Sequence, residues 1–388
     1  MSIVTIFIIF SFAIAELYYL VILSLMFGLN RAKTFHVSHE PFKTRVSVII
    51  PARNEQLHIL NCLDDLRKQE YPSGLTEVIL VDDGSTDDTA DSTKKFAERN
   101  PSFPFTILKL NPEDGSSGGK KRAISYAVSR SSGDLILTTD ADIRMGSLWI
   151  SGMVSFYEKH RPEMILGPVA YADGPGLFSK MQVCEFMGMM AATDGTAALR
   201  RPLMCNGANL AYTRDAFEQV RGFTGNMDVP SGDDMFLMMK IRKKFGKNAV
   251  MFNRSAETVV LTEPNRNLGE FLHQRLRWVS KNRSIRNPLV LLVAVITYLF
   301  NAILLLGMAG CFFYSRLWIL FVILFAGKLA VEFPVMRKYA VFLGKTDILR
   351  IVPLVQFVNI FYVTIVGLLG NFLSSEWKGR IVRPGTKH

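Results

Sequence analysis

The sequence predicts an α/β domain built on a mostly parallel central sheet, flanked by transmembrane helices. From residue 45 to residue 138, short apolar runs alternate with polar stretches long enough to form helices. Such alternation implies right-handed crossovers between parallel strands. Apolar blocks occupy both ends of the chain, and most of the carboxylates lie between them. This asymmetry indicates an aqueous domain held by membrane segments.

Four apolar runs are expected to form the strands of the sheet. These runs are Val46–Ile50, Val78–Val81, Phe105–Leu108 and Leu135–Thr138. Helices are expected between them at Glu55–Glu70, Thr86–Asn100 and Lys120–Arg130. Ligands of parallel sheets bind beyond the carboxyl ends of the strands, so functional residues should directly follow each run.

The apolar block near the amino terminus runs from Ile3 to Leu29, with Glu16 as its only charged residue. At about 1.5 Å per residue it is long enough to cross a hydrocarbon core of roughly 30 Å. It lacks the basic start and small-residue cleavage site of a signal peptide, so we expect an uncleaved anchor. Basic residues at positions 31, 33, 43 and 45 follow it and predict a cytoplasmic location for the next domain. Glu16 is expected to face protein, pair with another helix or snorkel.

Three more membrane segments are expected near the carboxyl terminus: Pro288–Tyr314, Leu317–Val335 and Ile351–Leu373. The basic stretch Met336–Arg350 separates the last two. The predicted organisation is an anchor at 1–30, a cytosolic domain at 31–286, membrane segments at 287–373 and a basic tail at 374–388. With the amino terminus outside, three full crossings leave this tail outside, against the charge rule. One of the three segments is therefore expected to be re-entrant or interfacial, and the sequence does not identify which.

The net charge of +11 favours loops that face anionic lipid and the cytoplasm. No nucleic-acid-binding motif accompanies this charge, so we expect no nucleic acid partner. The cysteines form no C-x-x-C pair and no metal-binding spacing, which favours reduced structural thiols. They are Cys62, Cys184, Cys205 and Cys311.

Two polar clusters follow the first two predicted strands and suit a nucleotide. The first is Pro51-Ala52-Arg53-Asn54-Glu55, and the second is Asp82-Asp83-Gly84-Ser85-Thr86. An acidic strand end followed by glycine and hydroxyl groups can form hydrogen bonds with a base and a ribose. Helix N-caps explain Ser85 and Thr86 equally well, and this alternative stays open.

Two further clusters suit a diphosphate and a cation. Gly118-Gly119-Lys120-Lys121-Arg122 opens a helix, where lysines oppose the helix dipole and are better explained by a nearby anion. The Walker spacing is not met, because Lys121 follows Lys120 where Ser or Thr is required. Asp140-Ala141-Asp142 follows a strand, and such carboxylates can share Mg²⁺ or Mn²⁺. The cation would stabilise a diphosphate as a leaving group.

The last two clusters suit the acceptor and the membrane surface. In Gly232-Asp233-Asp234, a carboxylate could accept the proton of an acceptor hydroxyl, or simply favour a helix start. In Gln274-Arg275-Leu276-Arg277-Trp278, Gln274 and Arg277 share a helix face while Arg275 points elsewhere. Arg277 could bind pyrophosphate and Trp278 could stack on a sugar, or the helix could be an interfacial belt.

Taken in order, these motifs resemble the membrane-bound family 2 glycosyltransferases of the GT-A fold, over about residues 45–285. The resemblance implies a nucleotide pocket of Pro51, Ala52, Asn54, Glu55, Asp82 and Asp83. It implies Lys120, Asp140, Gln274, Arg277 and Trp278 as further donor-binding residues. Asp142, with Asp140, would hold the metal. Asp234 would be the catalytic base, because it takes the last place of the family's Glu-Asp element. That element reads Gly-Asp-Asp here, so Asp233 is the alternative. The resemblance also implies an acceptor-side loop at Met204–Asn209 and a cytosolic tail element at Trp377–Arg380.

The resemblance implies an inverting transfer from a nucleotide sugar, most simply a UDP-sugar, with Mg²⁺ or Mn²⁺ as cofactor. Gln-x-x-Arg-Trp elements occur in processive polysaccharide synthases and in ceramide glucosyltransferase-like enzymes. Four membrane segments are few for a polymer channel, which favours one transfer to a lipid or lipid-linked acceptor in the cell (inner) membrane. A membrane receptor or carrier that only binds a nucleotide is the alternative of another class. It leaves Asp234, Arg277 and Trp278 without a role.

Overall fold

The computed structural model describes residues 2–38, 41–110, 119–227, 232–280, 287–370, 375–377 and 380–382. The chain forms two compact units, and each is described by itself. The helical unit comprises Met1–Arg31, Asp173–Thr196 and Pro264–His388, and the sheet unit comprises Ala32–Ala172 and Ala197–Glu263. The domains expected from the sequence divide the chain by hydropathy, whereas these two units divide it by packing contacts. The expected domains stay a prediction.

The sheet unit alternates strands and helices, as expected from the sequence. Its first elements are β1 (Val46–Ala52), α2 (Ile59–Arg67), η1 (Ser73–Leu75), β2 (Thr76–Asp82), α3 (Thr89–Arg99), β3 (Phe105–Lys109), α4 (Lys120–Arg130) and β4 (Leu135–Thr138). The rest are β5 (Arg144–Met145), α5 (Trp149–His160), β6 (Met164–Leu166), β7 (Val169–Tyr171), β8 (Leu210–Thr213), α7 (Arg214–Gln219), α8 (Asp233–Phe245), β9 (Val250–Phe252), η2 (Ala256–Thr258) and β10 (Val260–Thr262).

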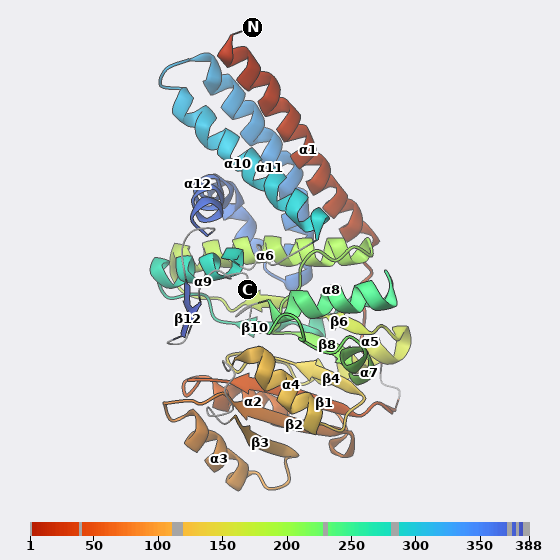
Figure 1. Ribbon diagram of the computed structural model, residues 1–388. Helices are drawn as coiled ribbons and strands as arrows, with labels where there is room; N and C mark the ends of the chain where they lie inside the picture. The colour runs from red at the N-terminus through yellow and green to blue at the C-terminus, as the bar shows by residue number, and fades with distance from the viewer. Residues whose placement is uncertain are drawn as a thin grey trace. The chain divides into compact units, whose positions relative to one another are not determined.

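The main sheet has the strand order β3-β2-β1-β4-β8-β6-β9 (Figure 1). β8 runs antiparallel to both neighbours, and the other pairs are parallel. The four predicted runs all form strands of this sheet, which confirms the fold class. β1 is buried at nearly every position, as expected for a central strand covered on both faces. A smaller sheet has the order β5-β10-β7.

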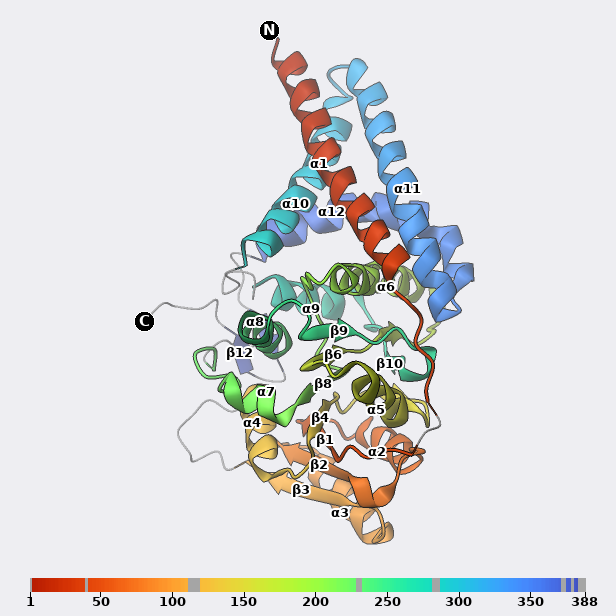
Figure 2. The same cartoon turned by 90° about the vertical axis from the view of Figure 1, so that its right-hand side faces the viewer.

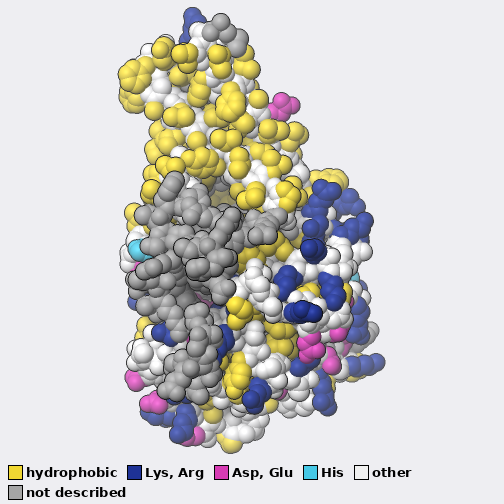
Figure 3. Space-filling model, viewed as in Figure 1, with side chains coloured by type: hydrophobic (Ala, Val, Ile, Leu, Met, Phe, Trp, Pro, Cys, Tyr) yellow, Lys and Arg dark blue, Asp and Glu magenta, His cyan; other side chains and the backbone are white. Residues whose placement is uncertain are grey.

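The helical unit contains the apolar segments. Its elements are α1 (Ile3–Arg31), α6 (Gly176–Ala198), α9 (Leu268–Ser280), α10 (Pro288–Gly310), α11 (Arg316–Leu343), η4 (Thr346–Ile351), α12 (Val352–Leu369), β11 (Ser375–Trp377) and β12 (Arg380–Val382). α1, α10, α11 and the η4–α12 segment are long and apolar enough to cross a membrane. Apolar side chains cover the surface formed by α1, α10 and α11 (Figure 3). Gly118, Lys378, Gly379 and the tail from residue 383 lie outside the described residues.

The bounds of α11 differ from expectation, and the exposed position of Glu16 leaves the snorkelling alternative open. α11 continues to Leu343, so its carboxyl-terminal turns include residues 336–343 of the predicted basic linker. Glu16 is exposed on α1 and does not face another helix of the described chain.

α12 lies crosswise to α1, α10 and α11, which run steeply side by side (Figure 2).

A buried charge pair joins three of the apolar helices. Nζ of Lys328 lies 2.5 Å from Oε1 of Glu332, one turn away on α11. It also donates to Oε1 of Gln356 on α12 at 2.9 Å, while the hydroxyl of Tyr18 on α1 donates to Glu332. Charges inside an apolar bundle persist only when they are paired. The cluster therefore fixes α11 against α1 and α12.

Candidate active site

The acidic clusters of the sequence meet at one edge of the main sheet. β2, β1 and β4 are adjacent and parallel, so their carboxyl ends lie side by side. Asp82 ends β2, and Asp140 follows β4. Only β1 separates these two strands, which places their ends roughly 10 Å apart at about 4.8 Å per strand spacing. The residues expected to be functional therefore lie at the carboxyl edge of β2, β1 and β4.

The loops after β1 and β2 are joined through Asn54. Its backbone N–H donates to Oγ of Ser85 at 3.0 Å, and its Oδ1 accepts from the N–H of Thr86 at 2.9 Å. Asn54 adopts a left-handed conformation with φ 52°, which is uncommon outside glycine and is often found at functional sites. α3 begins at Thr89 with Asp88 as its N-cap. Ser85 and Thr86 are thus not helix caps, and the alternative explanation for them is wrong.

Asp82 has a carboxylate oxygen aimed at no group of the described chain. Its Oδ1 accepts from the N–H of Ser85 at 2.9 Å, while the buried Oδ2 has no hydrogen-bond partner. Asp82 is only 1% exposed, and an unsatisfied buried acceptor costs about 1–3 kcal/mol. A ligand with an N–H or O–H group would remove that cost. Around it, Arg53 Nη1 donates to the carbonyl of Asp83 at 2.7 Å, and the N–H of Glu55 donates to Oγ1 of Thr89 at 2.7 Å.

Lys120 connects the carboxylates of two distant segments. Its Nζ lies 2.6 Å from Oδ1 of Asp140 and 3.6 Å from Oδ2 of Asp233. Lys120 is the first residue of α4, after the N-cap Gly119, where the helix dipole disfavours a cation. Burial acts to lower the pKa of Lys120, but the negative charges of Asp140, Asp233 and Asp234 outweigh it and raise the pKa. Carboxylates of the protein itself therefore lie beside this lysine, and the diphosphate expected there from the sequence stays a prediction.

Asp234 is held by the loop expected on the acceptor side. Its Oδ2 accepts from the N–H of Gly207 at 3.1 Å, and its Oδ1 accepts from the N–H of Met235 at 2.7 Å. A Cβ at position 207 would lie 2.8 Å from Nζ of Lys120 and 3.3 Å from Oδ2 of Asp233. Only glycine allows this approach without displacing Lys120. Asp233 and Asp234 also form the first turn of α8, where carboxylates interact favourably with the helix dipole. The helix-start explanation is therefore confirmed, and the role of a carboxylate as base stays a prediction.

The residues proposed to hold a divalent cation fit that role by their donor chemistry. Asp140 and Asp142 are both partly exposed, one residue apart at the end of β4. Burial raises the pKa of the Cys62 thiol, and the negative charges of Asp142, Asp65 and Asp140 raise it further. Sγ of Cys62 lies 3.8 Å from the carbonyl oxygen of Asp140. Within the described ranges, no group of three or more His, Cys, Asp or Glu side chains is gathered as a complete cage. Two carboxylates completed by substrate phosphates are the usual arrangement for Mg²⁺.

Gln274, Arg277 and Trp278 lie on α9, in the helical unit, and the sequence missed the residue that organises them. This residue is Arg275, which is 2% exposed. Its guanidinium lies 4.3 Å from the ring centroid of Trp278, pairs with Glu185 on α6 at 2.5 Å, and donates to Oε1 of Gln274 at 2.5 Å. One face of Trp278 is therefore covered by Arg275. Stacking of Trp278 on a sugar stays a prediction.

Comparisons with known proteins give a consistent classification. The model for "Glycosyl transferase family 2" matches residues 47–221, and that for "Glycosyl transferase family group 2" matches residues 135–343. An N-acetylglucosaminyltransferase of Rhizobium meliloti (strain 1021) is 28% identical over 258 residues, 62% of this chain and 57% of the relative. Glycosyltransferase AglE of Haloferax volcanii is 26% identical over 232 residues, 60% of this chain and 71% of the relative.

A solved structure has the same fold. The mannosyltransferase PcManGT from Pyrobaculum calidifontis, in complex with GDP-Man and Mn²⁺, superposes with a TM-score of 0.61 at 18% identity. The match covers 92% of this chain and 99% of that one. The chain's match to the Rhizobium protein, by contrast, spans 57% of that relative's length.

Proposed function

The chain belongs to the family 2 glycosyltransferases, and we propose that it moves one sugar from a UDP-sugar to a lipid or lipid-linked acceptor at a membrane surface. The transfer inverts the configuration at the anomeric carbon. The observation that carries the proposal is the position of Lys120 between Asp140 and Asp233. The Lys120 ammonium group contacts one carboxylate proposed for the donor side and one from the acceptor side. A direct displacement needs donor and acceptor held close together.

The nucleotide pocket of this proposal is formed by the loops after β1 and β2. Pro51, Ala52, Asn54, Glu55, Asp82 and Asp83 line it. Uracil carries a ring N–H, and the unpartnered Oδ2 of Asp82 is a matching acceptor. The hydrogen bonds between Asn54 and the Ser85–Thr86 turn hold the two loops together before the donor arrives, which reduces the ordering cost of binding.

In the reaction, the carboxylate of Asp234 accepts the proton of the acceptor hydroxyl. The acceptor oxygen forms a bond to the anomeric carbon as the bond from that carbon to the diphosphate oxygen breaks, and UDP departs with the electron pair. Lys120 stays protonated at neutral pH, because its pKa is raised by the surrounding carboxylates. Its ammonium group can therefore stabilise the charge of the departing diphosphate. Asp233 keeps Lys120 in place.

Asp140 and Asp142 would hold a divalent cation, with Asp142 as the main ligand. A bound Mg²⁺ or Mn²⁺ supplies Lewis-acid stabilisation of the leaving diphosphate. The Pyrobaculum mannosyltransferase of the same fold carries Mn²⁺ with GDP-Man, which agrees with this choice. The family resemblance implies Gln274, Arg277 and Trp278 as further donor-binding residues.

The proposed topology follows from the direction of α12. If α12 is interfacial or re-entrant, only α1, α10 and α11 cross the membrane. With the amino terminus outside, the sheet unit then lies in the cytoplasm and α11 returns the chain there, so the basic tail also stays inside, as the charge rule requires. The crosswise course of α12 (Figure 2) supports it as the segment that does not cross. A fluorescent protein fused after His388 should fluoresce, and alkaline phosphatase fused there should be inactive; the reverse pattern contradicts this topology.

The activity is tested with purified protein in detergent and a panel of labelled UDP- and GDP-sugars, with UDP-N-acetylglucosamine first because of the Rhizobium relative. Membrane lipids serve as acceptors, and product is partitioned into organic solvent. We expect solvent-extractable product that is lost with EDTA, with Asp142→Ala and with Asp234→Asn.

Three outcomes separate the alternatives. Transfer that survives EDTA and Asp142→Ala contradicts the metal site. A long water-soluble polymer contradicts single transfer. If Asp234→Asn binds UDP as the wild type does and keeps its turnover, Asp234 is not the base. If the wild type itself binds UDP but shows no turnover, the result favours the non-catalytic receptor.

A further inference from the structure

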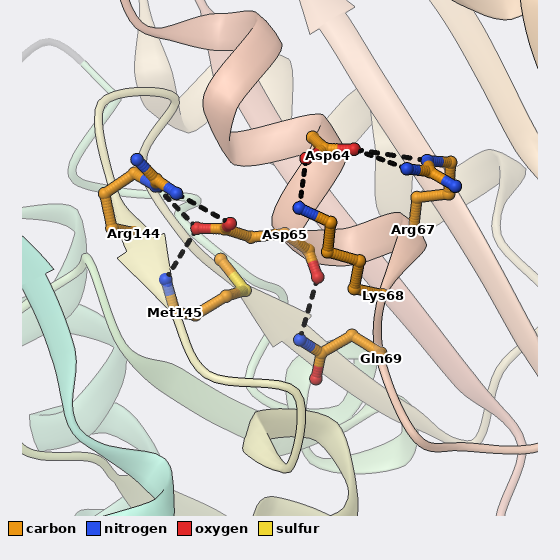
Figure 4. Close-up of polar contacts among 7 residues, drawn as sticks. All are labelled: Asp64, Asp65, Arg67, Lys68, Gln69, Arg144 and Met145. Atoms are coloured by element: carbon orange, nitrogen blue, oxygen red, sulfur yellow. Dashed lines mark hydrogen bonds and ion pairs between the residues drawn. The ribbon is translucent and has the colours of Figure 1, made fainter.

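α2 presents a polar face to the segment that follows Asp142. Cys62 and Asp65 are three residues apart on this helix, so they share one face, and Gln69 follows just after the helix ends at Arg67. Cys62 Sγ donates to the carbonyl of Asp140 at 3.8 Å. Asp65 and Gln69 contact residues 144–150, as Figure 4 shows in part. Cys62, Asp65 and Gln69 thus contact the chain at several points between Asp140 and the start of α5.

The Asp65 carboxylate accepts three hydrogen bonds from Arg144 and Met145. It accepts from Arg144 Nε at 2.7 Å, from Arg144 Nη2 at 2.9 Å and from the N–H of Met145 at 3.1 Å (Figure 4). The Asp65 side chain is 8% exposed, whereas that of Arg144 is 55% exposed. Two-pronged pairs between arginine and carboxylate impose orientation as well as energy. The buried aspartate is therefore the fixed member of the pair, and the arginine and backbone of residues 144 and 145 are oriented by it.

A second contact is made by Gln69, just beyond the carboxyl end of α2. Gln69 Nε2 donates to the carbonyl of Gly146 at 2.8 Å, and its Oε1 accepts from the N–H of Ile150 at 2.9 Å. The N–H of Glu70 donates to the carbonyl of Ser147 at 2.8 Å. The segment is thus anchored at several backbone groups, beginning at Met145.

Asp142 lies between two anchored points. On one side Thr138 ends β4 in the main sheet, and on the other Arg144 begins β5, which pairs with β10. Only residues 139–143 lie between these strands. A shift of the anchor at Arg144 and Met145 would therefore move the short backbone segment that carries Asp142.

We propose that Asp65 is a positioning residue, which holds Arg144 and Met145 so that Asp140 and Asp142 are oriented to bind a divalent cation with the donor diphosphate. This inference rests on the proposed function. Groups that orient metal ligands from behind, without touching the ion, typically change metal affinity or activity by about 10–100-fold when they are replaced. Asp65 is expected to act in this range.

The neighbouring aspartate provides a matched control. Asp64 pairs with Arg67 and Lys68 of its own helix (Figure 4) and contacts no residue of the 144–150 segment in any bond described here. Asp65→Asn and Asp64→Asn remove the same charge from adjacent positions. Arg144→Gln and Arg67→Gln form the second matched pair.

The test measures UDP binding by calorimetry with and without Mn²⁺, the melting temperature, and donor KM and kcat. We expect Asp65→Asn and Arg144→Gln to raise donor KM and to weaken Mn²⁺-dependent UDP binding by about 10–100-fold. UDP binding without Mn²⁺ should stay within about twofold of wild type, because the nucleotide pocket does not include the 144–150 segment. Arg144→Lys, which keeps the charge but loses the two-pronged geometry, should fall between wild type and Arg144→Gln. Asp64→Asn and Arg67→Gln should resemble the wild type.

Results that contradict the positioning role differ from results that contradict the proposed function. If Asp65→Asn matches Asp64→Asn in KM and in Mn²⁺-dependent binding while the wild type transfers sugar, the positioning role is overturned and the proposed function stands. If Asp65→Asn loses metal-free UDP binding to the same extent, Asp65 has a general structural role instead. A wild type with neither sugar transfer nor Mn²⁺-dependent UDP binding overturns the proposed function, and this inference with it.

Discussion

Lys120 and Asp140 form an ion pair with 2.6 Å between Nζ and Oδ1, at the position where the proposed function needs both a cation and a diphosphate. The pair joins the start of α4 to the end of β4. Lys120 opposes the dipole of its own helix, so its location is better explained by the carboxylates around it than by helix stability. The ammonium group is available to a diphosphate when a donor and its metal engage Asp140.

Replacing Lys120 by methionine should impair donor use more than folding. Loss of one charge-assisted hydrogen bond to the diphosphate, worth about 1.5–3 kcal/mol, corresponds to roughly a 10–100-fold fall in kcat/KM. The measurement is steady-state transfer with varied UDP-sugar. Lys121→Met is the matched control, because Nζ of Lys121 donates to the carbonyl of Asn226 instead. Equal losses of kcat/KM in both variants would contradict the role of Lys120.

Gly207→Ala should reproduce part of the Lys120→Met effect. The added Cβ would lie 2.8 Å from Nζ of Lys120, so the lysine must move while the loop keeps its backbone. We expect a fall in kcat/KM of about tenfold and a double variant that is no worse than Lys120→Met alone, because coupled sites are not additive. Fully additive losses in the double variant would show that the two residues act separately.

Glu77→Gln should lower stability at neutral pH and lose that effect in acid. The Glu77 carboxylate accepts from Ser47 Oγ at 2.5 Å, Ser132 Oγ at 2.9 Å and the N–H of Gly133 at 3.3 Å. Burial acts to raise the pKa of Glu77, but these hydrogen bonds outweigh it and hold the pKa below its usual value. A lowered folded-state pKa gives stability that is present above the unfolded-state pKa of about 4.3 and is lost as the pH falls through the folded-state value.

The check is thermal unfolding of wild type and Glu77→Gln in detergent at pH 7 and below pH 4. At pH 7 we expect a loss of about 1–2 kcal/mol, shrinking in acid. The exposed Glu98 of α3 supplies the control Glu98→Gln, which should unfold like wild type at both pH values. A Glu77→Gln loss that is the same at both pH values would contradict the assignment to the charged form.

Arg275→Met should destabilise the helical unit, while Arg277→Ala should mainly lower turnover. Removing Arg275 leaves Glu185 without the cation that lies 2.5 Å from it, and breaking one side of a buried pair costs about 3–5 kcal/mol. Adding Glu185→Gln to Arg275→Met should recover part of this stability. Melting temperature and turnover, measured for both single variants, give the comparison. A larger melting-temperature loss for Arg277→Ala than for Arg275→Met would reverse the roles assigned to the two arginines.

The sequence was sufficient for the strands and for the positions of the acidic clusters, because both depend on local features. Buried parallel strands are short apolar runs, and their polar ends follow directly. The lysine at the start of α4 was also readable, since its conflict with the helix dipole is a local anomaly. Its contacts were not, because Asp140 and Asp233 come from other elements.

The errors and omissions arose where identical residues differ only in their surroundings. Asp64 and Asp65 are neighbours, yet Asp64 is half-buried and pairs with Arg67 and Lys68 nearby, while Asp65 is buried and binds Arg144 from 79 positions away. Arg275 and Arg277 lie two positions apart, and only the contact with Glu185 on α6 identifies the buried one. Ser85 was assigned with Thr86 as a possible helix cap because the side chain that binds the turn, Asn54, precedes them by a whole strand–helix unit.

The insertion of α6 between β7 and β8 means that the polypeptide passes between the two units four times, at residues 31/32, 172/173, 196/197 and 263/264. Trimming both ends of the gene therefore does not yield a self-sufficient water-soluble enzyme. A fragment of residues 32–263 keeps α6 but discards Arg275 and Tyr362, the partners of Glu185. Separating the sheet unit from the helical unit requires excision of Asp173–Thr196 and rejoining of residues 172 and 197, in addition to removal of both ends.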